Sequence, residues 1–524
     1  MQPLSPCVDV GSLFCCLYTP RGRAVAMSPT LFSLLLKEQN LTTWEVFCVP
    51  YTATGRRLAQ ETNNRRLATV GLGRTTFDRW SSGTWFGRPR GEAAQILERM
   101  FGHPVDVLFA PAPDTNVPPV AMGSVATQVG SRWPTSSLLI PAGGPAGTWE
   151  ITGRHRLDGT SAAVHLLPVT KHGEEVNPAQ LDQEAQRDLE GFLRPARRGF
   201  LVGVEEHLGD LELYVREAAS ARRTGLPGLQ STGALSIPSA YLLDDLTYGI
   251  LWALTQLDDG LLADDQVLDS ERHIISTYLS LPRSAPSQFL VDLSAAGSSW
   301  MGSAFCAQHI EQELAKASEV PVFWTREQSG EEAAPWLFFR HKLDYLQALT
   351  RFHSSSTQTV RVFCLPENEI ARSEPYERVL LLLAIALMER LGIRVRVIPK
   401  PEYAEVDGVA LVPGHRAVVA NWVRAPGGAL WAAGSTSARG DLRTYASAFA
   451  DAQSNDVLAG ASDPAGRLRI LSAYLGLDWG WLTSRCRSLG EYGVAGLVRP
   501  RSRLLTVQAL DETLLFLGKL TSDR

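Results

Sequence analysis

Ten consecutive apolar residues, Val379 to Met388, constrain the fold of this chain more than any other feature. A membrane-spanning helix needs about 20 such residues, so the run fits a helix that is buried inside a protein. The segments on its two sides, "TVRVFCLP" and "IRVRVIP", have the composition of buried strands. Because a strand, a helix and a strand joined by short turns form a βαβ unit, residues 351–450 are predicted to be an α/β domain.

The charged residues are unevenly distributed along the chain. Residues 55–90 contain eight arginines against two carboxylates, whereas residues 200–280 contain thirteen carboxylates against four arginines. The formal net charge of the whole chain, -5, gives no global sign of a nucleic-acid binder. The asymmetry indicates that one segment is suited to an anionic partner and another is not.

The arginine-rich segment contains a short amphipathic pattern, "GRTTFDRWSSG". Helical spacing places Phe77 and Trp80 on one face and Arg74, Thr76 and Arg79 on the other. The major groove of DNA admits one α-helix, and an arginine can donate two hydrogen bonds to a guanine. The pattern therefore predicts a DNA recognition helix, with a basic surface of an ordinary helical bundle as the alternative.

The ends of the neighbouring helices follow from capping residues. We expect Thr75 to cap the recognition helix together with Asp78, and Gly83 to end it. An upstream helix is expected to follow Thr43 as its cap, and Pro50 should kink or split that helix. The residues predicted to contact DNA are Arg65, Arg66, Arg74, Thr75, Thr76, Arg79, Ser82, Arg88 and Arg90.

Several stretches match a known family of regulators: "LTTWEVF", "GRRLAQ", "VGLGRTTFDRWSSG" and "ILERMFGHPVDVLF". With them, residues 41–109 resemble the helix-turn-helix domain of the large actinobacterial regulators related to the XRE class. Stretches such as "WMGSAFCAQHI" and "CRSLGEYGVAGLVRPRSR" extend the resemblance over most of residues 40–510. The resemblance implies that Arg74, Thr75, Thr76, Arg79 and Trp80 lie on or under the recognition helix. Pro50 and Gly55 depart from an ideal first helix of that family.

Residues 358–450 also resemble half of the phospholipase-D-like fold, which some bacterial regulators carry as a sensor. The catalytic signature of that fold, a His and a Lys two apart, is absent, because Arg416 and Ala417 follow His415. Phosphodiester chemistry in that fold needs the His as its nucleophile. Since the sequence also contains no HExxH, GxSxG or GxxxxGK[ST] motif, we expect no enzymatic activity and no cofactor.

A segment dense in aromatic and charged residues, Phe323 to Lys342, is the candidate effector pocket. Its predicted lining is Trp324, Arg326, Glu327, Trp336, Arg340 and His341, and Glu331 and Lys342 are further candidates for the same lining. The alternative is a helix end with satisfied ion pairs and an aromatic core, because tryptophans are mostly core residues. His309, one helix earlier, is expected to be a core histidine.

Three acidic pairs, Asp244–Asp245, Asp258–Asp259 and Asp264–Asp265, are predicted to lie on a solvated helical face. Their offsets do not fit a metal-binding loop, which uses alternate oxygens on a tight turn. A cationic-ligand site and an acidic face that keeps this region off DNA stay open as alternatives. No metal site is predicted.

The predicted fold class is multidomain, with α and α/β domains. The boundaries are a disordered N-terminus at 1–27, a helix-turn-helix domain at 28–110, a linker at 111–130, a small β-rich segment at 131–199, a helical domain at 200–350, an α/β sensor domain at 351–450 and a C-terminal helical region at 451–524. Met1 and Met27 both stay open as the natural start.

The seven cysteines are scattered and show no ligand spacing, which favours reduced thiols in the cytoplasm. We expect no membrane segment, and a nucleoid-associated transcriptional regulator that binds double-stranded DNA. One short recognition helix makes few contacts, so a homodimer is expected, with a small-molecule effector as a further candidate partner. The alternative function is an enzyme or a scaffold in which the N-terminal helical module is a docking domain.

Overall fold

The structure is a computed structural model, and it describes residues 30–520 with internal gaps. The gaps are residues 40, 63, 83–88, 110–118, 142–143, 171–174, 180, 182, 195–197, 208–209, 224–234, 271–276, 278–292, 316, 318, 353–357 and 424–431. The disordered N-terminus predicted at 1–27 lies outside the described residues. The chain divides into two compact units: an N-terminal unit, residues 1–119 with 141–144, and a C-terminal unit, residues 120–140 with 145–524.

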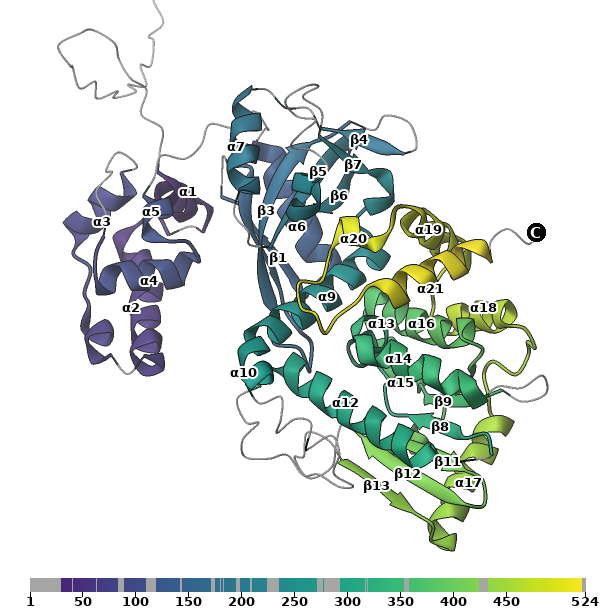
Figure 1. Cartoon of the computed structure of the whole chain (residues 1–524). Coiled ribbons are helices and arrows are strands. Elements are labelled where there is room, and N and C mark those ends of the chain that lie inside the picture. The colour runs from purple at the N-terminus through teal and green to yellow at the C-terminus, as the bar shows by residue number, and fades with distance from the viewer. Residues whose placement is uncertain are drawn as a thin grey trace, which may run out of the picture. The chain divides into compact units, whose positions relative to one another are not determined.

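The N-terminal unit is helical throughout its described part (Figure 1). Its elements are α1 (Leu31–Glu38), α2 (Trp44–Glu61), the 3-10 helix η1 (Arg65–Thr69), α3 (Arg74–Ser81), α4 (Glu92–Phe101) and α5 (Val105–Leu108). They surround an aromatic core centred on Phe32, whose ring lies 6.0 Å from that of Phe47, 5.4 Å from that of Phe101 and 4.9 Å from that of Phe109. Each short helix is amphipathic, so this shared core stabilises all of them.

Helix α2 runs without interruption through Pro50, so the predicted split is wrong, whereas the predicted kink stays a prediction. Phe47 and Tyr51, on the two sides of the proline, are 0% and 1% exposed. Their burial in one core outweighs the hydrogen bond that the proline cannot donate. The packing also requires a glycine at position 55, because a Cβ there would lie 2.7 Å from the carbonyl oxygen of Leu67.

The first part of the C-terminal unit is a five-stranded sheet in the order β1-β2-β3-β5-β6. Its strands are β1 (Ser136–Leu139), β2 (Ala146–Ile151), β3 (Thr160–Pro168), β5 (Gly199–His207) and β6 (Asp210–Glu217), and β4 (Val176–Pro178) pairs with β7 (Ser236–Pro238) beside it. Neighbouring strands are antiparallel except β3 and β5, which are parallel. The helices of this part are α6 (Pro119–Arg132) and α7 (Gln183–Leu193).

The second part is a six-stranded mixed sheet in the order β10-β9-β8-β11-β12-β13. Its strands are β8 (Val322–Thr325), β9 (Val360–Cys364), β10 (Arg394–Ile398), β11 (Val409–Val412), β12 (Arg416–Asn421) and β13 (Ala432–Thr436). Strands β8, β9 and β10 are parallel, and the other neighbours are antiparallel. The predicted βαβ unit is confirmed as β9, α16 (Pro375–Arg390) and β10, and every residue of Val379–Met388 is buried.

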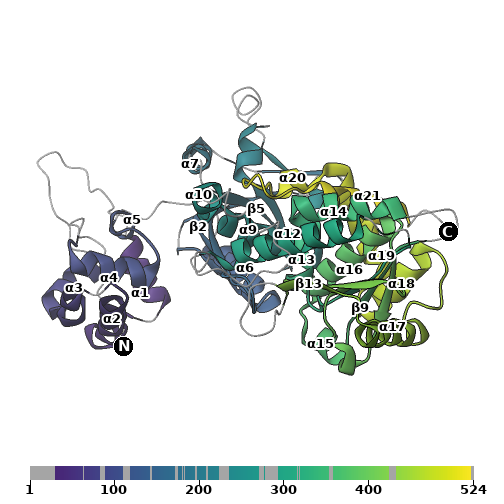
Figure 2. The same ribbon diagram turned by 60° about the horizontal axis from the view of Figure 1, so that its bottom comes forward.

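Helices cover both faces of this sheet. Helix α12 (Ala295–Leu314) packs on β12 and β13, whereas α17 (Arg439–Ser454) packs on β10, β11 and β12, and Figure 2 shows the two helices on opposite sides of the strands. Helix α16 packs against α9 (Asp245–Ala263), α13 (Gly330–Phe338), α18 (Pro464–Tyr474) and α21 (Gln508–Lys519). The remaining helices are α10 (Asp265–Ser270), α14 (Arg340–Leu349), α15 (Glu367–Arg372), α19 (Trp479–Tyr492) and α20 (Val494–Leu497).

Two predicted boundaries are wrong. The linker at 111–130 becomes helix α6 from Pro119, because Val125, Val129 and Trp133 form a buried stripe at helical spacing. The helical domain at 200–350 contains strands β5 to β8, and Phe200 to Val204 are buried on both faces of their sheet. A strand that is buried on both faces does not alternate, so its pattern is indistinguishable from a buried helix.

The mixed α and α/β class is confirmed at that level. Within the described residues, no helix combines the length and the apolarity that crossing a membrane requires.

Candidate functional sites

The face of α3 that points away from the core is polar. Phe77 and Trp80, the two large apolar side chains of the helix, are 2% and 5% exposed and belong to the aromatic core. The exposed positions of the helix are Arg74, Thr75, Thr76, Asp78 and Arg79. The segregation of faces that the spacing predicted is therefore confirmed, and α3 presents two guanidinium groups to the outside.

The start of α3 is fastened to the start of α2. The indole Nε1 of Trp44 donates a hydrogen bond of 2.9 Å to the carbonyl oxygen of Leu72, and Arg74 forms an exposed ion pair of 3.6 Å with Glu45. The helix begins two residues earlier than predicted, with Gly73 as its N-cap. Thr75 therefore lies inside the first turn, and its predicted capping role is wrong. The predicted end at Gly83 lies outside the described residues.

The other residues predicted to contact DNA lie near α3 in the sequence. Arg65 and Arg66 are exposed on η1, which a four-residue turn, Val70 to Gly73, joins to α3. Ser82 follows α3 directly, and its hydroxyl donates to the carbonyl oxygen of Arg79 at 2.8 Å. Arg90 is exposed, and Arg88 lies outside the described residues.

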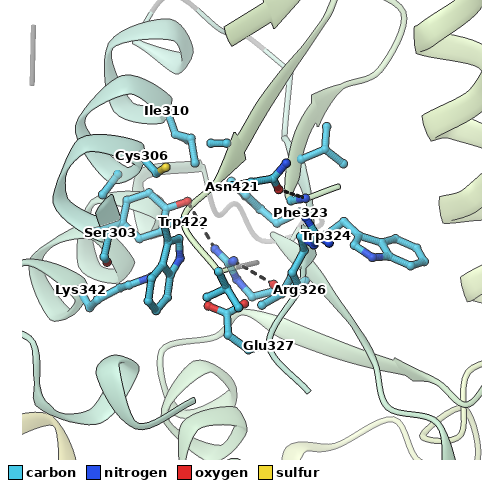
Figure 3. Close-up of a pocket in the computed structure, with 18 of the residues that line it drawn as sticks. Ser303, Cys306, Ile310, Phe323, Trp324, Arg326, Glu327, Lys342, Asn421 and Trp422 are labelled. Atoms are coloured by element: carbon cyan, nitrogen blue, oxygen red, sulfur yellow. Dashed lines mark hydrogen bonds between the residues drawn. The ribbon is translucent and has the colours of Figure 1, made fainter. Parts of the chain in front are cut away.

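A second candidate site is a cavity of about 50 Å³ between α12, α14 and the six-stranded sheet (Figure 3). Its polar lining consists of Ser303, Cys306, Thr325, Arg326, Glu327, Lys342, Tyr345, Arg361 and Asn421, and its aromatic lining of Phe323, Trp324, Trp336 and Trp422. About 10–15 Å³ of such space holds one water molecule, so the cavity has room for a few waters or a small ligand.

Four of the six predicted pocket residues line this cavity: Trp324, Arg326, Glu327 and Trp336. The ring of Trp324 is turned away from the other labelled side chains in Figure 3 and packs against Phe449 of α17, so only part of this residue borders the cavity. The inclusion of Arg340 and His341 is wrong. Arg340 is exposed and donates to the carbonyl oxygens of Arg503 and Leu505.

His341 does not line the cavity, but it contacts Ser303 of the lining. Its Nε2 is 2.9 Å from the hydroxyl oxygen of Ser303. Burial, together with the charge of Lys342, lowers the pKa of His341 to about 3. The ring is therefore neutral in the folded protein and acts as a packing and hydrogen-bonding group.

Lys342 of α14 is one of the buried charged groups in the cavity lining. Its Nζ lies 3.4 Å from the ring centroid of Trp336 and 4.3 Å from that of Trp422, and Figure 3 shows the lysine alongside Trp422. Burial lowers the pKa of Lys342 to about 7, although the nearby Glu327 opposes that shift. Burial also raises the pKa of Glu327. Glu327 accepts a hydrogen bond of 2.9 Å from Nε1 of Trp336.

Arg361 on β9 is the second buried cation of the wall. Its guanidinium donates to the hydroxyl oxygens of Thr325 at 3.1 Å and Tyr345 at 3.4 Å, and it lies over the ring of Trp336 at 4.9 Å. Sequence reasoning missed Arg361 of β9 and Trp422, the residue after β12, which both lie far from Phe323–Lys342 in the sequence. No local signal connects these segments, because the sheet order places β9 and β12 beside β8 and β11.

The acidic pairs do not form a solvated face. The first member of each pair is buried, with Asp244, Asp258 and Asp264 at 3%, 0% and 5% exposure, and each accepts several hydrogen bonds. His309 is 3% exposed and stacks on Phe305, so the prediction of a core histidine is confirmed. In the part of the chain that the structure describes, no group of His, Cys, Asp or Glu side chains is placed to hold a metal ion.

In comparisons with known proteins, no family model, no curated protein and no solved structure matches the chain.

Proposed function

We propose that this protein is a sequence-specific DNA-binding transcriptional regulator. In this proposal the N-terminal unit binds double-stranded DNA with α3 in the major groove. The C-terminal unit dimerises and senses an effector. The protein acts in the cytoplasm, associated with the nucleoid.

The observation that carries the proposal is the division of α3 into a buried and an exposed face. Phe77 and Trp80 fix the helix in the core, and Arg74, Thr75 and Arg79 stay exposed. Arginine side chains at the start of such a helix can reach guanine edges, and flanking arginines can neutralise phosphates. A four-residue turn with two glycines joins η1 to α3. This arrangement agrees with a helix-turn-helix motif, in which such a turn joins the two helices.

The resemblance of residues 41–109 to actinobacterial regulators of the XRE-related class supports the same function. The resemblance of residues 358–450 to a phospholipase-D-like half supports a non-catalytic sensor. His415 lies exposed at the turn between β11 and β12, and Ala417 occupies the position, two residues later, where the signature has its lysine. An eight-residue helix covers few base pairs. Two copies on half-sites about 34 Å apart would supply the remaining contacts, which is why a homodimer belongs to the proposal.

The test is a gel shift of the full chain on the DNA upstream of its own gene, at several salt concentrations. Arg74→Ala and Arg79→Ala should each weaken specific binding by roughly 10-fold to 100-fold, as expected for the loss of a base contact of about 1–3 kcal/mol. Arg469→Ala, which removes an exposed arginine of α18, is the matched control and should bind like the wild type.

Binding that depends on salt supports phosphate contacts, because each contact releases counterions. If both α3 variants bind like the wild type, and binding does not respond to salt, the proposal is wrong. Substrate turnover by the intact chain would favour the enzyme alternative instead.

A further inference from the structure

Two buried cations line the cavity under α12, and neither is paired with a carboxylate there. Lys342 and Arg361 are 3% and 4% exposed. Among the residues that the structure describes, the Lys342 ammonium lies over two indole rings and has Glu327 nearby without forming an ion pair with it, and Arg361 donates to two neutral hydroxyl groups. The Nε atom of Arg361 is buried without a hydrogen-bond acceptor. Hydrogen-bonding capacity toward an anion is therefore unused in this wall.

The charges of the lining do not balance. Glu327 is the one carboxylate in the lining, against Lys342 and Arg361, while the guanidinium of Arg326 is paired with Glu405 at 3.1 Å. A buried charge without a counter-charge is costly, because water no longer solvates it. The cavity thus carries an excess of one positive charge whenever Lys342 is protonated.

The rest of the lining is apolar. Ala307 and Ile310 of α12, together with Phe323, Val409 and Val423 from the sheet side, supply aliphatic and aromatic surface. The cavity of about 50 Å³ favours a small ligand. A group that fits must be small, must carry a negative charge at one end and can be apolar at the other.

We propose that this cavity binds a small monocarboxylate with a short apolar tail, and that its carboxylate lies between Lys342 and Arg361. This inference rests on the proposed function, because the carboxylate would be the effector of the regulator. One negative charge neutralises the excess of one, whereas a dianion would reverse it. Hydrogen bonds between a cation and a carboxylate are among the strongest in proteins, and they are stronger still away from water.

Binding of this anion is linked to proton uptake by Lys342. The titratable or charged groups that face the lysine are Glu327 from the segment after β8, Arg361 from β9 and Cys306 from α12, with His341 and Tyr345 on its own helix. Because a bound carboxylate raises the pKa of the lysine above its value of about 7, affinity should be highest between about pH 5 and about pH 7, where the ligand is still ionised. Above pH 7 it should fall by up to about 10-fold per pH unit.

Isothermal titration calorimetry of the full chain with acetate, propionate and butyrate tests the proposal, with propionamide as the uncharged match. At least one carboxylate should bind, and propionamide should bind at least 10-fold more weakly. Lys342→Met should weaken binding by 10-fold or more. Lys519→Met, which changes an exposed lysine at the end of α21, should leave binding unchanged.

Glu327→Gln is the second variant, and it keeps an oxygen acceptor for Trp336 while it removes the competing negative charge. It should bind the carboxylate several-fold more tightly, which a merely structural role of Glu327 does not predict. Equal binding of propionamide and propionate would overturn the proposal, as would unchanged binding by Lys342→Met, weaker binding by Glu327→Gln or tighter binding of inorganic phosphate than of every carboxylate.

The two proposals fail separately. Calorimetry without DNA measures the cavity alone, and the gel shift without added carboxylate measures α3 alone. Carboxylate binding without DNA binding keeps the anion site and rejects the regulator. DNA binding without carboxylate binding rejects the anion site only.

Discussion

Glu331, a candidate for the pocket in the sequence, does not line the cavity and instead organises a loop. Its side chain is 3% exposed, and it accepts backbone N–H bonds from four consecutive residues, 154 to 157, at 2.8–3.3 Å. Successive N–H groups that converge in this way form an anion-binding nest, and the protein fills it with its own carboxylate. Gly153 permits the tight approach, since a Cβ there would lie 1.8 Å from the carbonyl oxygen of Leu157.

Glu331→Gln should therefore destabilise the C-terminal unit by about 2–4 kcal/mol, because the neutral amide satisfies fewer of the four buried donors and adds donors of its own. Urea unfolding followed by circular dichroism measures the change. Glu367→Gln, an exposed glutamate in the first turn of α15, is the control and should change the free energy of unfolding by less than about 0.5 kcal/mol. Equal stability of the two variants would contradict this role of the nest.

At the scale of one element, α9 uses its acidic residues as attachment points. Asp244 caps the helix and pairs with Arg485 of α19, while Asp264 at the other end accepts hydrogen bonds from Ser294, the N-cap of α12. Asp258, in between, is paired with Arg198 just before β5. The second residue of each pair is more exposed than the first. Each acidic pair thus combines a buried residue, which connects α9 to a neighbouring element, with a more exposed residue.

Asp258→Ala should cost about 3–5 kcal/mol of stability, because it leaves the buried Arg198 without its closest partner and frees the backbone N–H groups of Arg501 and Ser502. Asp265→Ala is the control. It removes a partner of the exposed Arg503, an ion pair of 3.6 Å, and should cost less than about 1 kcal/mol. Thermal unfolding of both variants measures the difference. Similar unfolding midpoints would contradict the stabilising role of Asp258.

Periodicity predicted most of what lies within one element, and little of what brings elements together. The βαβ unit around Val379–Met388 and the two faces of α3 followed directly from apolar spacing. Strand β5 did not, because burial on both faces removes its alternation. Arg361 and Trp422 could not be assigned to the cavity, since the strand order that unites them with Lys342 is set by pairing between distant segments. The DNA-binding role of α3 stays a prediction.

At the scale of the whole molecule, the two units use charge in opposite ways. The arginines of residues 55–90 that the structure describes are exposed, and Arg65, Arg74 and Arg79 all lie on the surface of the N-terminal unit. The acidic excess of residues 200–280 is partly buried, as Asp258 and Glu217 show beside Arg198. Exposed charge is available to a partner, whereas buried, paired charge serves the fold. The asymmetry in the sequence therefore corresponds to exposed charge in the N-terminal unit and to partly buried charge in the C-terminal unit.

The stability of the C-terminal unit should depend on pH through a buried histidine whose ring nitrogens have no hydrogen-bond partners. His165 on β3 is 2% exposed, and neither ring nitrogen has a hydrogen-bond partner. Burial lowers the pKa of His165 to about 4. As the pH falls below 6.5, the unfolded chain takes up a proton that the folded protein refuses until about pH 4, so the free energy of unfolding decreases over that interval.

Between pH 7.5 and pH 5.0, His165 alone should account for a loss of about 2 kcal/mol, at about 1.4 kcal/mol per pH unit below its ordinary pKa. His165→Leu and His165→Gln should both remove this part of the pH dependence, because neither side chain titrates. They should differ at pH 7.5, where leucine gains from burial and glutamine leaves polar atoms unpaired. Urea unfolding at the two pH values measures both effects, and a wild-type slope in both variants would refute the assignment.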